Sequence, residues 1–239
     1  MDHELVGTRV LVVNGTSGVG PSVARAFAER GAVVTVAAAA DSPQLPPELA
    51  HLDVLAHSTS DPEQLPGLFE RAGRVDVVVI LANSIRRSDA LTMPAPEVEA
   101  LIREKLTIPL LCIREAGRRM AADGGGRVIT FISMSGKTGT HEEVAVPAAG
   151  MGGLISFSRS LAVDLAPRGV TVNVVATALF EPNTSALPAD RQQHLLQGIP
   201  VGRFGDPEEA AHAALYLASP KAGFVTGETL NLSGGRFMD

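Results

Sequence analysis

One stretch of the chain, VDVVVILAN at residues 75–83, restricts the possible fold most strongly. An apolar run without polar alternation is typical of a strand in a parallel sheet that is covered on both faces. Shorter runs of the same kind occur at residues 9–13, 32–40, 128–132 and 170–176, and helical patterns separate them. This alternation predicts an α/β fold, a Rossmann-like doubly wound parallel sheet with helices on both faces.

Length and composition favour a single domain over residues 1–239, because 45% of the residues are hydrophobic and no low-complexity linker interrupts the chain. The net charge is -6 and the basic residues are scattered, so nucleic acid is not an expected partner. The lone Cys112 excludes a disulfide framework and a cysteine-rich metal site. Because no signal peptide or membrane-length apolar run is found, we expect a cytoplasmic protein without membrane contact.

A glycine-rich turn, NGTSGVG, follows the first predicted strand, and Pro21 then suits the first turn of a helix. A strand, a glycine turn and a helix in this order can hold a pyrophosphate at the helix N-terminus. The second predicted strand ends in four alanines, and these offer no group that would distinguish NAD from NADP. NAD(P) is therefore a possible cofactor, and none is favoured. The candidate cofactor-binding residues are Asn14, Gly15, Ser17, Gly18, Val19, Gly20 and Asn83.

Residues 126–166 combine a strand, a polar loop and a long helix. Ser133 stands where the strand ends, on the side of an open α/β sheet that binds ligands. His141 and Glu142 follow in the loop, and His141 has the ordinary pKa range of an acid–base group. Glycines at residues 150, 152 and 153 lie in the first turns of the helix, where each costs about 1 kcal/mol relative to alanine. We therefore expect something to approach this helix closely.

These segments, together with VGRFGDPEEAA and VTGETLNLSGG further along, resemble the short-chain dehydrogenase/reductase family in family order. In that family a serine, a Tyr-x-x-x-Lys pair and an asparagine carry out NAD(P)-dependent hydride transfer. Aligning LISFSRSLA puts Pro147 at the tyrosine and Met151 at the lysine, and a shift by one residue puts Val146 and Gly150 there instead. The asparagine aligns with Lys105 in REKLTIP. The only tyrosine, Tyr216, lies far along the chain. The resemblance retains Ser133 and departs from the family at the other three positions.

Because proline and methionine have no titratable proton, we expect non-redox acid–base chemistry on a small organic substrate. A lyase, isomerase, cyclase or epoxide reaction would fit, and halohydrin dehalogenases are a precedent in the family. An NAD(P)-dependent oxidoreductase with an atypical proton donor, and a non-catalytic pseudoenzyme subunit, are the alternatives. The candidate catalytic residues are Ser133, His141, Glu142 and Lys105, and the candidate substrate-binding residues are Phe180, Glu181, Met151 and Pro147.

The segment at residues 178–198 is an irregular insert that we expect to cover the substrate, since such loops carry specificity. Its leucines indicate an apolar or mixed pocket. In the family, two long helices pair subunits, so the resemblance implies a homodimer or homotetramer through the helices at residues 96–123 and 145–166. No metal is expected, since the histidines lack ligand spacing.

Overall fold

The computed structural model describes residues 5–39, 45–57, 61–82, 84–139, 141–181, 184–185 and 187–238. In this part of the chain, seven parallel strands form one sheet in the order β3-β2-β1-β4-β5-β6-β7. The strands are β1 (Arg9–Val13), β2 (Val33–Ala39), β3 (Asp53–His57), β4 (Val77–Leu81), β5 (Gly126–Ser133), β6 (Val170–Thr177) and β7 (Thr229–Leu232). The predicted doubly wound parallel sheet is confirmed.

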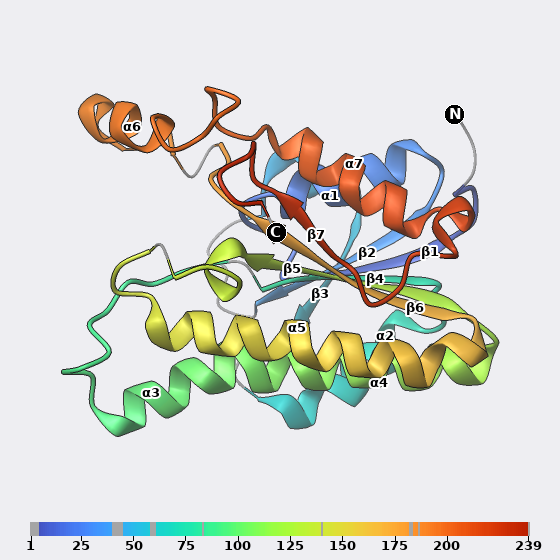
Figure 1. Ribbon diagram of the computed structural model, residues 1–239. Helices are drawn as coiled ribbons and strands as arrows, with labels where there is room; N and C mark the ends of the chain where they lie inside the picture. The colour runs from blue at the N-terminus through green and yellow to red at the C-terminus, as the bar shows by residue number, and fades with distance from the viewer. Residues whose placement is uncertain are drawn as a thin grey trace.

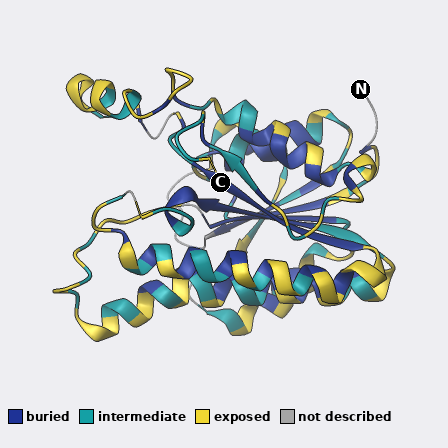
Figure 2. Ribbon diagram, in the orientation of Figure 1, coloured by how far each residue is buried: buried dark blue, intermediate teal, exposed yellow. Residues whose placement is uncertain are grey.

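Helices cover both faces of the sheet (Figure 1). One layer holds α1 (Gly20–Glu29) and α7 (Pro207–Ala218), and the other holds α2 (Leu65–Ala72), α4 (Ile108–Asp123) and α5 (Ala145–Leu165). Two more helices, α3 (Ala95–Ile102) and α6 (Ala189–Leu196), lie toward the end of the sheet where the strands terminate. Figure 2 shows a buried sheet between half-buried layers, and α6 has no buried residue.

Alternate residues of each strand face different layers, which explains why the strands are apolar throughout. In β1, Val10 and Val12 pack with Phe27 on the α1 side. Leu11 and Val13 belong to the cluster on the opposite face, under α2 and α4. Because side chains alternate across a strand, a strand that is covered twice needs an apolar residue at nearly every position.

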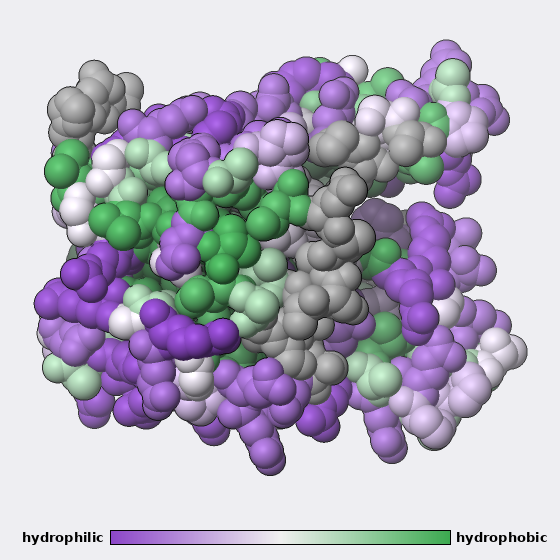
Figure 3. Space-filling view, turned by 180° about the vertical axis from the view of Figure 1, so that it is seen from behind, coloured by the Kyte–Doolittle hydropathy of each residue, from purple (hydrophilic) through white to green (hydrophobic). Residues whose placement is uncertain are grey.

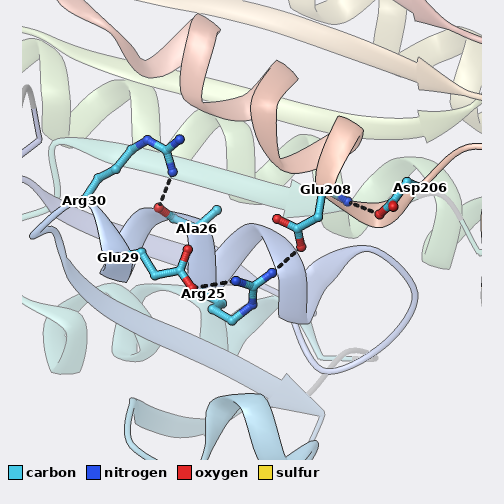
Figure 4. A network of polar contacts seen from close by, with 6 residues as sticks. All are labelled: Arg25, Ala26, Glu29, Arg30, Asp206 and Glu208. Carbon is cyan, nitrogen blue, oxygen red and sulfur yellow. Dashed lines mark hydrogen bonds and ion pairs between the residues drawn. The ribbon is translucent and has the colours of Figure 1, made fainter. Parts of the chain in front are cut away.

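The layer of α1 and α7 is held by ion pairs as well as apolar packing. Arg25 on α1 donates to Glu29, at 2.5 Å, and also to Glu208 on α7 (Figure 4). Asp206 caps α7 by accepting from the Glu208 N–H at 2.9 Å, and Glu209 completes a capping box. These contacts fix the first helix, and with it the turn before it, against the C-terminal part of the chain.

The helix predicted for residues 96–123 is interrupted in the structure. Its middle is a π-helical segment, Arg103–Thr107, which joins α3 to α4. Pro109 lies four residues after Lys105, so it has no N–H for the Lys105 carbonyl and its ring would crowd that oxygen. A widened turn relieves this conflict and is a known cause of helix distortion. The turn places the Lys105 side chain inside the protein, where the residue is 4% exposed.

The close approach predicted for the glycine-bearing helix is confirmed. A Cβ atom on Gly150 would lie 2.9 Å from Cβ of Lys105, and one on Gly153 would lie 2.9 Å from Leu106. The partner that approaches α5 is therefore the π-helical segment. Gly150 lets the two backbones come close enough for Lys105 to be enclosed between them.

Candidate active site

The candidate residues gather where the parallel strands end. Asn14 follows β1, Ser84 follows β4 by a few residues, and Ser133 is the last residue of β5. Strands that run in parallel bring their carboxyl ends to one edge, which is the edge where open α/β sheets bind ligands. The candidate active site is therefore at this edge, and Asn83 lies outside the described residues.

Asn14 shapes the glycine turn and has a positive φ of 59°, a conformation that asparagine adopts more readily than most residues. Its backbone N–H donates to the Ala37 carbonyl at 2.9 Å, and its Nδ2 donates to the Leu81 carbonyl at 3.4 Å. Its buried Oδ1 has no hydrogen-bond partner among the described residues. Asn14 therefore links β1 to both neighbouring strands.

The rest of the turn fits a phosphate group. A Cβ on Gly20 would lie 2.5 Å from the Gly15 carbonyl oxygen, so the turn closes tightly on itself just where α1 begins. Gly18 has φ 58°, Ser17 is exposed, and no acidic residue occupies the first turn of α1. An anion at such a helix N-terminus meets free N–H groups and a favourable dipole. These residues fit the dinucleotide that the sequence allowed, with Val19 buried beneath them.

Ser133 is 9% exposed and lies at the end of the sheet where the strands terminate. Its Oγ accepts from the Ser135 backbone N–H at 3.2 Å and lies 3.0 Å from the Ser135 hydroxyl. The short helix that follows, Met134–Gly136, presses on α5, since a Cβ on Gly136 would lie 2.8 Å from Cβ of Met151. Ser135, which sequence reasoning did not select, thus orients the hydroxyl of Ser133.

Lys105 reaches the same edge from the π-helical segment. Its Nζ donates to the Ser84 hydroxyl at 2.8 Å and to the Glu104 carboxylate at 2.5 Å. An ammonium has three protons, so one remains beyond these two bonds. The Glu104 side chain is 53% exposed, whereas that of Lys105 is 5% exposed, so the ion pair connects an enclosed amine to solvent. Sequence reasoning did not foresee Ser84.

Met151 and Pro147 lie in the first turns of α5 and are both buried. Met151 is fully enclosed and packs in the apolar cluster beneath the sheet. The structure thus places these two predicted substrate-binding residues beside the Ser133 loop as part of the protein interior. Neither side chain carries a titratable group at the cleft.

His141 and Glu142 line a different hollow, which we call the α6 cavity. It has a volume of about 400 Å³. Its lining is Arg87, His141, Glu142, Leu179, Leu187, Arg191, His194, Leu195 and Arg236. Burial lowers the pKa of His141, and the positive charges of Arg236 and Arg87 lower it further. His141 is therefore neutral near pH 7, and its buried Nδ1 has no hydrogen-bond partner among the described residues.

Phe180 and Glu181 begin the insert at residues 178–198 but differ in their surroundings. Phe180 is 6% exposed, and its ring fills the space that a Cβ on Gly205 would need. The exposed Glu181 donates its backbone N–H to the Gly205 carbonyl at 3.0 Å. Phe180 also lines a smaller cavity of about 130 Å³ with Val201 and Phe204. The insert is thus anchored by Phe180.

The predicted catalytic residues therefore form two groups. Ser133 and Lys105 lie against α5, whereas His141 and Glu142 face the α6 cavity. Within the described residues, no set of three or more His, Cys, Asp or Glu side chains is arranged to hold a metal ion. The helices of the described ranges include none of the length and apolarity needed to cross a membrane.

Comparison with known proteins gives a consistent result along the whole chain. A family profile described as enoyl-(acyl carrier protein) reductase matches residues 13–236. The 3-oxoacyl-[acyl-carrier-protein] reductase of Escherichia coli K12 is 34% identical over 97% of this chain and 98% of its own. The reductase of the same name from Aquifex aeolicus is 32% identical over 99% of this chain and 100% of its own.

A solved structure supports the same relation. The crystal structure of a short-chain type dehydrogenase/reductase from Mycobacterium marinum superimposes with a TM-score of 0.87 and 29% identity, covering 98% of this chain and 97% of its own. The prediction of non-redox lyase or isomerase chemistry is wrong, because the curated relatives that match over the full length are named as reductases. The chain is an enzyme, and it belongs to the short-chain dehydrogenase/reductase family.

Proposed function

We propose that this enzyme is an NAD(P)-dependent oxidoreductase that interconverts a carbonyl group and an alcohol in a small 3-oxoacyl-type substrate. The observation that carries this proposal is the similarity to 3-oxoacyl-[acyl-carrier-protein] reductases, which are 34% identical over 97% of the chain. The tight glycine turn and the serine at the end of β5 agree with it.

The residues that would hold the cofactor are those of the glycine turn. Its pyrophosphate would meet the backbone N–H groups between Ser17 and Gly20. A bound nicotinamide supplies or accepts the hydride. The buried ends of β1 and β2 exclude water from the floor of this site.

The family's tyrosine and lysine align with Pro147 and Met151, so the proton of the alcohol needs another source. We assign it to Lys105, whose ammonium has a proton beyond those given to Ser84 and Glu104. As carbonyl reduction forms an alkoxide, the N–H bond of Lys105 breaks and its proton passes to the substrate oxygen. The exposed carboxylate of Glu104 then returns a proton from water to the amine. Ser133 holds the substrate oxygen by its hydroxyl.

His141 is the less suitable donor. Its pKa is lowered by burial and by two guanidinium groups, so the imidazole is already deprotonated at neutral pH. It also lines the α6 cavity, whereas Lys105 lines a different cavity with Ser84 and Glu104. A general acid has to carry its proton when the reaction begins, and this favours Lys105.

The test is steady-state reduction of ethyl acetoacetate with NADPH or NADH, followed by loss of nicotinamide absorbance. Lys105→Met and Ser133→Ala should each lower kcat by about 100-fold, the usual contribution of one acid–base group. His141→Ala is the matched comparison and should retain kcat within about threefold. Calorimetry should find the cofactor Kd of the Ser133→Ala enzyme unchanged. If Lys105→Met keeps its full kcat while His141→Ala loses it, His141 is the proton donor and the assignment to Lys105 is wrong.

A further inference from the structure

Three arginines from distant parts of the sequence meet at the α6 cavity. Arg87 lies in the loop between β4 and α3, Arg191 lies on α6, and Arg236 lies in the tail after β7. Figure 3 shows the molecule hollowed beneath the lobe that carries α6. Only one carboxylate, that of Glu142, joins them in the described lining, so the cavity has an excess of positive charge.

Several arginines outside the cavity have carboxylate partners. Arg86 pairs with Glu97 at 2.6 Å, although it adjoins Arg87 in the sequence, and Arg203 pairs with Glu209 at 2.7 Å. Arg87 and Arg191, in contrast, have no hydrogen bond or ion pair with any described residue. Unpaired guanidinium groups that converge on a hollow are well suited to bind an oxyanion through two parallel N–H bonds.

The third arginine is held in place. The Arg236 guanidinium donates to the carbonyl of Leu195 at 3.2 Å, which ties the C-terminal tail to the end of α6. The same cation acts on His141, since Arg236 and Arg87 both lower the pKa of that imidazole after the effect of burial. The buried Nδ1 of His141 has no hydrogen-bond partner among the described residues.

We infer that the α6 cavity binds a carboxylate or phosphate group that the substrate carries besides its reacting carbonyl. Arg87, Arg191 and Arg236 would hold the oxyanion, and Leu179, Leu187 and Leu195 would contact apolar parts of the same substrate. A volume of about 400 Å³ is in the range of small-ligand pockets. The assignment of the anion to a substrate rests on the proposed function. The binding of an anion in this cavity is independent of it.

The experiment compares three probes that share the acetoacetyl group. Acetoacetate carries a carboxylate, acetoacetyl-phosphopantetheine carries a phosphate, and ethyl acetoacetate is uncharged. Each is titrated by calorimetry, and its KM is measured with NADPH and NADH. The variants are Arg87→Gln and Arg191→Gln, and Arg168→Gln is the matched control because it removes an exposed guanidinium before β6, at the opposite edge of the sheet.

The wild-type enzyme should bind at least one charged probe about tenfold more tightly than ethyl acetoacetate, and each cavity variant should lose that preference about tenfold. The Arg168→Gln control and the KM for ethyl acetoacetate should not change. A preference for acetoacetate identifies a carboxylate ligand, and a preference for the phosphopantetheine thioester identifies a phosphate.

Equal binding of all three probes, or loss of charged-probe affinity in the Arg168→Gln control as well, overturns the inference. Thermal unfolding of each variant shows whether it is folded, and both cavity substitutions are at exposed positions. If charged probes bind through the arginines but no probe is reduced, the anion site stands and the proposed reductase function fails. If ethyl acetoacetate is reduced without any preference for charged probes, the proposed reductase function stands and the anion site fails.

Discussion

Replacing Gly20 with alanine tests whether the glycine turn is the cofactor site. The new Cβ would lie 2.5 Å from the Gly15 carbonyl oxygen, 2.7 Å from its carbonyl carbon and 2.8 Å from its Cα. An ordinary contact is 3.4 Å or longer, so the two backbone segments have to separate. All three atoms belong to the backbone, and no flexible side chain can move aside. Overpacking of this kind costs about 1–3 kcal/mol.

Gly67 provides the control, because a Cβ there would meet nothing within 4 Å and it lies inside α2. Gly67→Ala should stabilise the protein by about 0.5–1 kcal/mol through helix propensity alone. Urea unfolding of both variants should therefore give changes of opposite sign. A ligand at 100 times its Kd adds about 2.7 kcal/mol to stability, so cofactor binding is visible in the same assay.

The wild type and Gly67→Ala should be stabilised by NADPH or NADH, and Gly20→Ala should lose most of that stabilisation. The physical reason is that opening the turn moves the N–H groups at the start of α1 away from the pyrophosphate. If Gly20→Ala binds the dinucleotide as well as Gly67→Ala does, the turn is only a scaffold and the reasoning is refuted.

Two further predictions concern the buried polar groups of α4. Arg118 and Arg119 hold the pKa of Glu115 at about 2, against an ordinary 4.5, so its stabilising effect is present above pH 4.5 and disappears as the pH falls toward 2. Glu115→Gln should lower the free energy of unfolding by about 2 kcal/mol at pH 7, a value already reduced because Arg118 is exposed, and by almost nothing near pH 2. Urea unfolding of the variant and the wild type between pH 2 and pH 7 measures this difference. A difference that stays constant across the range would show that the ion pairs are unimportant. Burial raises the pKa of Cys112 to about 12, so iodoacetamide should leave the folded enzyme unmodified at pH 8 and label it in urea. Rapid labelling of the folded enzyme would contradict the burial of this thiol.

The fold could be predicted from the sequence because its signals are local. The apolar run at residues 9–13 corresponds to β1 (Arg9–Val13), and Pro21 lies in the first turn of α1 as expected. The π-helical segment was missed, although Pro109 inside a helical pattern was a visible signal for a distortion at Lys105. The helix at residues 96–123 was predicted as continuous because the wider turn of the π-helical segment changes its apolar periodicity only slightly.

The site was predictable only in part, because it depends on contacts between distant residues. Ser133 could be placed from its position at a strand end, but the bond from Lys105 to Ser84 required the structure. The arginines of the α6 cavity come from three separate segments, and no spacing pattern connects them. The functional prediction was wrong because it gave more weight to Pro147 and Met151 than to the similarity of the whole chain to reductases.

The central claim is that this enzyme transfers a hydride, and isotope transfer tests it most directly. The enzyme is incubated with ethyl acetoacetate and NADPH or NADH deuterated at the transferable nicotinamide position, and the alcohol product is analysed by mass spectrometry. We expect one deuterium in each product molecule with at least one of the two cofactors, and much less product from Gly20→Ala at a cofactor concentration that saturates the wild type. If no alcohol forms with either cofactor, or if it forms without deuterium, the chain is not the oxidoreductase proposed.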